Sequence, residues 1–396
     1  MTSFLFQNAR LIFPTGIESG ELLTRGREIC HIVRGGRVPA ELAGDATVVD
    51  CGGLYLSPGF IDVHCHGAGG YDYMDDAPEA IEAAARTQLA FGATTVLPTA
   101  LTAPFAEMAD FLRRFDAIPS ERPDGPDLPG VHIEGPYFSP GQGGAQPADQ
   151  IRDPDPAEYE ALLALSSRIL RWSFAVERPG ATAFLRRLRQ AGISSSLAHS
   201  DASCRQVIEA VDEGLDCLTH FYSAMSTVTR RQGYRVAGVV EAGYLLPELR
   251  VEVIADGCHL PAELLQLIYQ VKGADRIILV SDSMRAAGLP EGPSVIGKPG
   301  SGTPCIVEGG VARTLDRSSF AGSVATADRL VRTMYRLTTA PLHEVVRMMT
   351  LNPAELVGLD RRKGSLATGK DADLLLFDED IRLHRIFVRG EERRPG

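Results

Sequence analysis

Two histidines at the end of an apolar run are the residues with the clearest chemical potential. Residues 57–70 read SPGFIDVHCHGAGG, in which Cys65 separates His64 from His66. Side chains alternate faces along an extended strand, so both imidazoles point one way and Cys65 points the other. Imidazole binds Zn, Fe, Ni and Cu. The pair therefore predicts half of a metal site.

Further ligand-type residues follow other apolar runs. They are Glu134 after VHI, His199 after SSLA, His220 after LT, Asp256 and His259 at or just beyond VEVIA, and Asp282 after IILVS. Even without Asp256 and His259, the four remaining histidines and two carboxylates exceed the needs of one tetrahedral zinc ion. Two arrangements stay open: two ions that share Glu134, or one ion that uses a subset and keeps an open position. Water at such a position has a pKa near 7.

Asp282 suits proton transfer. It could act as general base toward water and then as general acid toward a leaving group, although a role as metal ligand or helix N-cap is the alternative. His132 lies two residues before Glu134 and is expected deeper in the fold. His31, His343 and His384 lie outside the predicted site.

The apolar runs predict the fold that positions these residues. Eight strand-like runs, mostly separated by helical patterns, cover 61–66, 94–98, 131–134, 172–176, 195–199, 218–222, 251–255 and 277–280. This alternation predicts an α/β fold, the (β/α)8 TIM barrel, whose catalytic groups lie at the carboxyl ends of the strands. A doubly wound sheet is the alternative, but it favours fewer strands and a glycine-rich phosphate loop, which the sequence lacks.

The two ends of the chain predict a second unit. Short strand patterns occupy 4–6, 10–13, 20–24, 28–33 and 47–50 near the start, and 373–377 and 383–389 near the end. Neither set suffices for an independent sandwich, so we expect both termini to form one small β-sandwich domain. The expected organisation is 1–56 for its first part, 57–360 for the metal-dependent barrel and 361–396 for its second part.

Charge and cysteine content narrow the function classes. The 396 residues carry a net charge of −11, which argues against nucleic acid or an anionic membrane as a partner. Neither a signal peptide nor a membrane-spanning apolar segment is visible. The seven cysteines are odd in number and scattered, which indicates no disulfide framework and favours the reducing cytoplasm.

Seven motifs resemble the amidohydrolase superfamily and, within it, the N-acetylglucosamine-6-phosphate deacetylase family. They are PGFIDVHCHG (58–67), GVHIEGPYFSP (130–140), LAHSDA (197–202), LTHFYSAM (218–225), IADGCH (254–259), LVSDSM (279–284) and FAGS (320–323). The tail GSLATGKDADLLLF (364–377) is similar to the segment that leads from the barrel back into the β-domain in members of the superfamily. Many superfamily members bridge two metals with a strand-four lysine, but RWSFAVE offers none, and the family resembled uses the glutamate equivalent to Glu134.

The resemblance also implies roles for individual residues. It implies a divalent metal, with Zn or Fe favoured and one or two ions per subunit, held by His64, His66, Glu134, His199 and His220. Asp282 becomes the catalytic acid/base, and His259 and the backbone at Ser223 and Ala224 face a substrate phosphate. Arg231, or its neighbour Arg230, would reach into the partner's site in a homodimer.

Three departures from the family pattern concern the substrate. Gln146 replaces a histidine that helps to polarise the carbonyl, and glutamine can donate a hydrogen bond but cannot become cationic. Ser223 replaces an asparagine, and TVTRRQGYRVAG (227–238) replaces a more regular loop. Two of these changes touch the phosphate region, so the deacetylase chemistry is better supported than the sugar phosphate.

The leading functional hypothesis is hydrolysis of the acetamide of N-acetylglucosamine 6-phosphate, a small-molecule substrate. The nearest alternative is the same reaction on N-acetylgalactosamine 6-phosphate or an unphosphorylated N-acyl compound. A cyclic-amide hydrolase is disfavoured by the missing lysine. A catalytically silent scaffold is disfavoured because every ligand and Asp282 are present.

Overall fold

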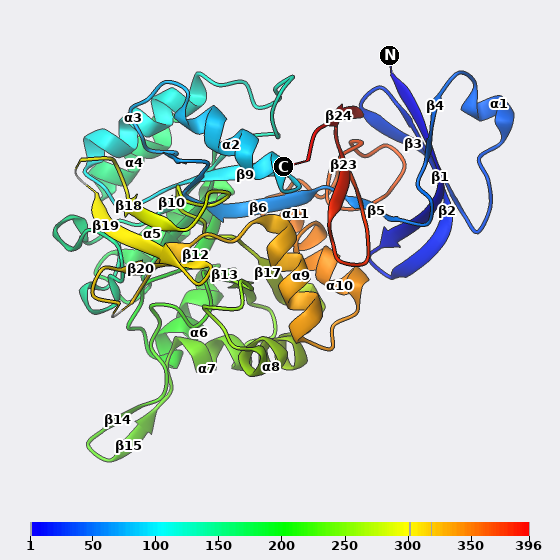
Figure 1. Ribbon diagram of the computed structural model, residues 1–396. Coiled ribbons are helices and arrows are strands. Elements are labelled where there is room, and N and C mark those ends of the chain that lie inside the picture. Colours follow the sequence, from blue (N-terminus) through cyan, green and yellow to red (C-terminus); the bar gives the residue numbers. More distant parts are fainter. Residues whose placement is uncertain (1, 301, 318, 396) are drawn as a thin grey trace.

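Alternating strands and helices build the central body of the protein (Figure 1). The structure is a computed structural model that describes residues 2–300, 302–317 and 319–395. The central strands are β6 (Phe60–Cys65), β9 (Ala93–Ala100), β10 (Val131–Glu134), β11 (Ile169–Phe174), β12 (Ser194–Leu197), β13 (Cys217–Leu218), β16 (Arg250–Val253) and β17 (Ile277–Leu279). They pair in parallel in chain order. This confirms the predicted (β/α)8 barrel.

The first and last barrel strands meet through a few polar contacts. The amide N–H of Asp282 donates to the carbonyl oxygen of His64 over 2.9 Å. Ser281 donates its amide N–H to the Asp62 carboxylate over 3.3 Å. These bonds join the end of β17 to β6, so the ring closes beside the two histidines.

Seven helices connect successive barrel strands and cover the outside of the barrel. They are α2 (Ala80–Ala90), α3 (Phe105–Asp116), α4 (Pro156–Leu165), α5 (Ala181–Ala191), α6 (Cys204–Glu213), α7 (Val239–Leu245) and α8 (Ala262–Lys272). In α5, Phe184, Leu185 and Leu188 are buried on one face, while Arg186 and Arg187 pair with surface glutamates. This helical spacing of apolar and charged residues is why the segment packs against the sheet.

Several of the predicted strands end earlier than expected. The run 218–222 was expected to be extended throughout, but β13 ends at Leu218, and 195–199 ends as β12 at Leu197. His220 and His199 adopt positive φ angles of 32° and 46°, which are incompatible with a strand. The chain therefore turns abruptly where these histidines lie.

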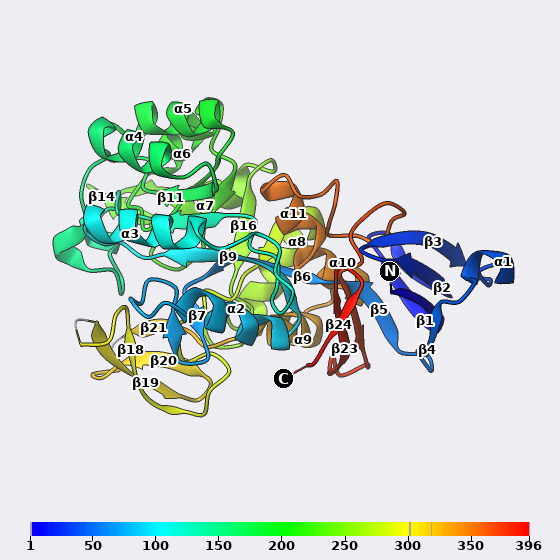
Figure 2. The same cartoon turned by 90° about the horizontal axis from the view of Figure 1, so that it is seen from above.

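Three features that follow barrel strands were not expected from the sequence. After β17 comes a separate sheet of β18 (Gly292–Ile296), β19 (Thr303–Glu308), β20 (Val311–Thr314) and β21 (Phe320–Ser323). It lies at the end of the barrel away from the β-domain (Figure 2). Helices α9 (Ala327–Leu337), α10 (Leu342–Met348) and α11 (Leu351–Leu356) follow it. The segment 223–233 contributes β14 (Thr229–Arg231) to a hairpin with β15 (Tyr234–Val236).

Short elements complete the barrel region. A small hairpin of β7 (Gly67–Ala68) and β8 (Tyr71–Asp72) follows His66 directly. Three 3₁₀ turns cover Pro140–Gln142, Ala148–Gln150 and Ala274–Arg276. Within the described residues, no helix combines the length and apolar character needed to cross a bilayer.

Strands from both ends of the chain share one sheet, as predicted. They are β1 (Ser3–Phe13), β2 (Gly16–Arg25), β3 (Glu28–Arg34), β4 (Thr47–Asp50), β5 (Tyr55–Pro58), β22 (Leu374–Phe377), β23 (Leu383–Val388) and β24 (Glu391–Arg393); the helix α1 (Ala40–Ala43) precedes β4. Antiparallel pairing of β22 with β5 joins the two ends. Phe4 and Phe6 pack edge-on against Phe387 in its core. The boundaries 1–56, 57–360 and 361–396 stay a prediction.

A buried lysine ties this sheet to the barrel. The Lys363 Nζ atom lies 2.6 Å from the Asp127 carboxylate, which belongs to a barrel loop. It also contacts Asp373, just before β22, and lies 3.5 Å from Asp371. All four side chains are buried. The ammonium group therefore links three carboxylates at the junction between barrel and β-domain. Arginines share two of them: Arg389 pairs with Asp127, and Arg27 and Arg362 pair with Asp371.

We expect Lys363→Met to lower the free energy of unfolding by about 3–5 kcal/mol, because it leaves buried carboxylates without their shared cation. Urea denaturation followed by circular dichroism measures this loss. Lys298→Met is the matched control, because Lys298 pairs with the largely exposed Asp76 and such pairs contribute about 0–1 kcal/mol. Equal losses in the two variants would contradict the proposed role of the junction.

Candidate metal centre and active site

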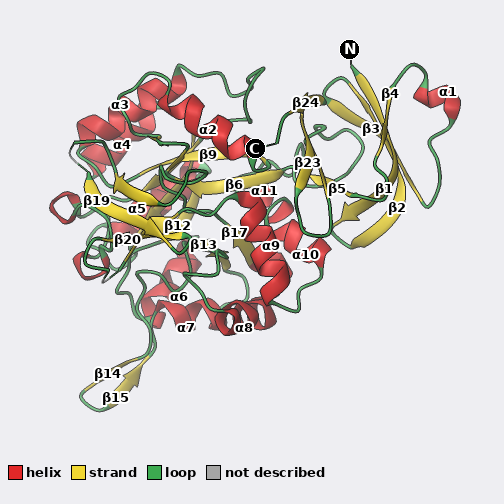
Figure 3. Ribbon diagram, in the orientation of Figure 1, coloured by secondary structure: helices red, strands yellow, loops and turns green. Residues whose placement is uncertain are grey.

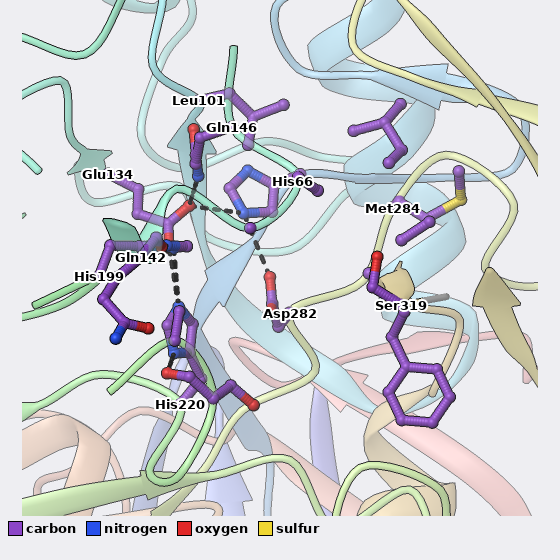
Figure 4. A pocket seen from close by; sticks show the side chains of 18 of the residues that line it. His66, Leu101, Glu134, Gln142, Gln146, His199, His220, Asp282, Met284 and Ser319 are labelled. Atoms are coloured by element: carbon purple, nitrogen blue, oxygen red, sulfur yellow. Dashed lines mark hydrogen bonds and ion pairs between the residues drawn. The ribbon is translucent and has the colours of Figure 1, made fainter. Parts of the chain in front are cut away.

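The carboxyl ends of the barrel strands open onto a cavity of about 450 Å³. Side chains from many strands converge on it (Figure 4). Its lining includes nine residues singled out from the sequence: His66, Glu134, Gln146, His199, His220, Ser223, Ala224, His259 and Asp282. His64 lies beneath this lining and is fully buried. The barrel therefore brings together residues that are more than two hundred positions apart.

Two groups of metal-ligating atoms share the Glu134 carboxylate. In one group, His220 Nε2 lies 3.2 Å from both His199 Nε2 and Glu134 Oε1. In the other, His66 Nε2 lies 3.3 Å from both His64 Nε2 and Glu134 Oε2. Asp282 Oδ1 lies 3.2 Å from His66 Nε2, on the cavity side of the second group. The two groups meet at Glu134. Its Oε2 faces His66, and its Oε1 faces His64, His199 and His220.

The backbone at three of these residues is turned sharply. His199, His220 and Asp282 have φ angles of 46°, 32° and 44°, in a region that L-amino acids other than glycine rarely adopt. Each of them lies two or three residues beyond the end of a short strand. Such conformations cost of order 1–3 kcal/mol and cluster at functional sites. Here they aim all three side chains inward over the cavity floor.

The electrostatics of the site favour positive charge between the carboxylates. Burial lowers the pKa of His66, but hydrogen bonds to Asp282 and Glu134 outweigh it and raise this pKa to about 9. Burial raises the pKa of Glu134, yet the charge of His64 and hydrogen bonds to His199 and His220 hold this pKa well below its usual value. The site therefore attracts a cation, whether the charge is carried by a proton or a metal ion.

Two further residues of the lining are held in defined orientations. Asp256 accepts a hydrogen bond from His259 Nδ1 over 2.8 Å, and the Phe320 ring from β21 packs against this imidazole. Gln146 Oε1 accepts from the amide of Thr102, so its Nε2 donates to Glu134 Oε2 over 2.8 Å. The Gln146 amide group is therefore a donor toward the site and supports the shared carboxylate.

Comparison with known proteins agrees with this geometry. Residues 55–394 match the sequence model of the Amidohydrolase family. The chain belongs to the amidohydrolase family. It is 35% identical over 338 residues to an N-acetylgalactosamine-6-phosphate deacetylase from Escherichia coli O157:H7, a match that covers 85% of this chain and 87% of that protein. It is also 35% identical over 342 residues to the N-acetylglucosamine-6-phosphate deacetylase from Lysinibacillus sphaericus, covering 86% of each.

A solved structure extends the likeness over the whole fold of this amidohydrolase. The crystal structure of N-acetylglucosamine-6-phosphate deacetylase from Pasteurella multocida superposes with a TM-score of 0.90 at 27% sequence identity. The superposition covers 99% of this chain and 100% of that chain. The barrel and the sheet formed by both termini are thus shared with that enzyme.

One predicted contact lies outside the cavity of the single chain. Arg231 and Arg230 are exposed on β14, in the hairpin that projects away from the barrel (Figure 3). Neither residue lines the cavity. Among the described residues, those of the hairpin therefore do not line the cavity of their own chain.

Several residues at the site went unrecognised in the sequence. Met284, Ile296 and Phe320 form a wall of the cavity, and two of them lie on the unpredicted sheet β18–β21. Glu252 and Arg171 lie fully buried within the barrel strands β16 and β11. A charged residue inside an apolar strand is the signal that could have found this last pair, since such residues are buried only with partners.

Proposed function

We propose that this amidohydrolase is a metal-dependent deacetylase that converts N-acetylglucosamine 6-phosphate into glucosamine 6-phosphate and acetate. The observation that carries the proposal is the pair of donor groups around Glu134, with Asp282 beside them on the cavity floor. Two relatives at 35% identity that bear deacetylase names support the reaction class. Amino-sugar catabolism is the setting that this reaction implies.

The donor set suits a divalent cation. Imidazole nitrogens and one carboxylate converge within hydrogen-bonding distance of one another, the combination that binds Zn or Fe. His199, His220 and Glu134 would hold one ion, and His64, His66 and Glu134 a second. A bound divalent cation supplies Lewis acidity, which activates water and polarises an amide carbonyl.

Asp282 is the residue that we assign to proton transfer. Burial raises its pKa, but the charge of His64 and a hydrogen bond to His66 outweigh burial and lower this pKa, so the group is a carboxylate. Its oxygen can take a proton from water and pass it to the departing amine nitrogen. Gln146 keeps Glu134 in place, while His259 and the backbone at Ser223 and Ala224 would face the phosphate.

N-acetylgalactosamine 6-phosphate is the second candidate substrate. The relatives named for the two sugar phosphates are equally similar to this chain, at 35% identity each. Acetate release should be measured with both phosphorylated sugars and with free N-acetylglucosamine, with metal content recorded. We expect the phosphorylated sugars to react faster. Activity on the free sugar alone would contradict the phosphate assignment, and no release from metal-loaded protein would contradict the deacetylase.

A homodimer is the assembly that we propose, with the β14–β15 hairpin reaching into the partner's site. Arg230 pairs with Arg235 across the hairpin, and both lie in solvent with Arg231. Like charges opposite one another are unfavourable, so an anionic group such as the substrate phosphate would stabilise them. We further propose that the protein is cytoplasmic, which its seven free cysteines support.

Mixing two inactive variants tests the shared site. One is Asp282→Asn and the other is R230A/R231A. If each arginine serves the partner's site, a mixed dimer contains one complete site, and an equilibrated equal mixture should recover about one quarter of wild-type activity. No recovery, or a monomer in sedimentation, would contradict the shared site.

A further inference from the structure

A line of buried polar residues crosses the barrel beneath the candidate metal ligands. Arg171 on β11 forms an ion pair with Glu252 Oε1 on β16. The other oxygen of Glu252 lies 3.0 Å from Nδ1 of His64 on β6. All three side chains have no solvent exposure. Removing both charges of this ion pair from water costs free energy, so we looked for a function of the pair other than stability.

Glu252 contacts one residue of each ligand group. Besides His64 Nδ1, its Oε2 accepts the backbone N–H of His220 over 3.2 Å. His220 is the residue that leaves β13 with a positive φ. One carboxylate therefore supports the side chain of His64 in one group and the strained backbone turn at His220 in the other.

The ion pair determines the tautomer of His64. The guanidinium of Arg171 can only donate hydrogen bonds, and an ionised carboxylate can only accept them. With Glu252 facing it, Nδ1 of His64 must carry the hydrogen. Nε2 then keeps its lone pair, and it is this atom that points at His66 and Glu134. Arg171 is itself held by Ser196 Oγ at 2.9 Å and Thr219 Oγ1 at 3.2 Å.

The other ligand imidazoles are supported differently. Nδ1 of His199 lies 2.8 Å from the carbonyl oxygen of Gln142, and Nδ1 of His220 lies 3.2 Å from that of Ser223. Nδ1 of His66 has no hydrogen-bond partner among the described residues. Of the four imidazoles, His64 is the one with a carboxylate behind it. A carboxylate raises the basicity of a ligating imidazole and fixes its orientation.

We propose that Glu252, held by Arg171, is a positioning residue that keeps His64 Nε2 available and thereby sets cation occupancy of the His64/His66 subsite. The inference rests on the cation-binding part of the proposed function, but it is independent of the substrate. Its effect on the imidazole tautomer is specific to one of the two groups, because the Nδ1 atoms of His199 and His220 rely on backbone carbonyls instead.

Glu252→Gln tests the proposal sharply. The glutamine amide has one acceptor and one donor end, and the native neighbours of both carboxylate oxygens are donors. If its oxygen stays with Arg171, its NH₂ meets His64 Nδ1 and drives the hydrogen to Nε2, which then cannot bind a cation. We expect Zn²⁺ affinity at one subsite to fall by about 10–100-fold, the usual effect of losing such a partner.

Asp62→Asn is the matched control. Asp62 is fully buried on the same strand as His64, and its Oδ1 accepts from the amides of His64 and Ser281. Its Oδ2 has no partner, so asparagine can place its NH₂ there and keep both bonds. We expect this variant to bind Zn²⁺ like the wild type. This variant shows whether loss of a buried carboxylate charge inside the barrel is by itself enough to weaken Zn²⁺ binding.

Zn²⁺ titration of the metal-free proteins against a chromophoric chelator measures stoichiometry and affinity, and circular dichroism verifies folding. Glu252→Asp separates positioning from packing. Aspartate keeps an acceptor-only carboxylate but loses volume, so we expect it to retain more Zn²⁺ affinity than Glu252→Gln. A purely structural role predicts the reverse order.

Two outcomes would overturn the inference: unchanged Zn²⁺ binding by a folded Glu252→Gln variant, or complete loss of one subsite in Glu252→Asp. If Glu252→Gln does not fold, the Zn²⁺ titration of Glu252→Asp still tests the inference. Wild-type protein that binds no Zn²⁺ would instead contradict the cation-binding function itself, so the two failures are distinguishable.

Discussion

Replacing Asp282 by asparagine is expected to lower kcat for acetate release by about 10²–10⁴-fold, the range for loss of a positioned acid/base. Asparagine has the same shape but cannot take up and release a proton at neutral pH. Asp282 Oδ1 lies 3.2 Å and 3.5 Å from the Nε2 atoms of His66 and His64. Steady-state kinetics with N-acetylglucosamine 6-phosphate measures the loss.

Metal content measured on the same Asp282→Asn preparation separates proton transfer from ligation. If Asp282 moves the proton, the variant keeps its bound metal while kcat falls. If Asp282 instead serves chiefly as a ligand, metal and activity are lost together, and added metal restores part of the activity. This second result would contradict the assigned role and leave the cation site in place.

Glu134→Gln is expected to abolish cation binding at both donor groups and to lower activity by at least about 10²-fold. The two donor groups share this carboxylate. Its Oε2 faces His66, and its Oε1 faces His64, His199 and His220. Glutamine is neutral, and its NH₂ would face ligand atoms that a cation needs. Metal analysis after dialysis against a weak chelator, together with acetate release, measures both effects.

Glu177→Gln is the matched control for this prediction. Glu177 follows β11, so it also lies at the rim formed by the carboxyl ends of the strands. Its carboxylate accepts hydrogen bonds from Ser200 Oγ and the amide of Asp201, both at 2.7 Å, and it does not line the cavity. We expect this variant to retain its metal. Retention of both ions by Glu134→Gln would contradict the shared-ligand arrangement.

Part of this protein could be predicted from local patterns. Alternation of apolar runs and helical segments indicated the barrel, because parallel strands buried on both faces must be apolar and need helical crossovers. The spacing of His64 and His66 indicated that their side chains share a face, and their Nε2 atoms do lie 3.3 Å apart. The roles assigned to the site residues stay predictions that the variants above test.

Other features depend on contacts between distant segments. The sheet β18–β21 supplies Ile296 and Phe320 to the cavity wall, but its strands are short and partly exposed, so their patterns are weak. The turned backbones of His199 and His220 were read as strand, because the apolar runs before them gave no signal of a positive φ.

Residue type and position after an apolar run are local properties, so they indicate which residues could bind a metal. How these residues are held depends on contacts across the fold. Glu252 lies 188 residues from His64, and Arg171 lies 81 residues from Glu252, so no spacing rule connects them. Closure of the barrel brings these strands together, and the low-dielectric interior then requires each buried charge to find its partner.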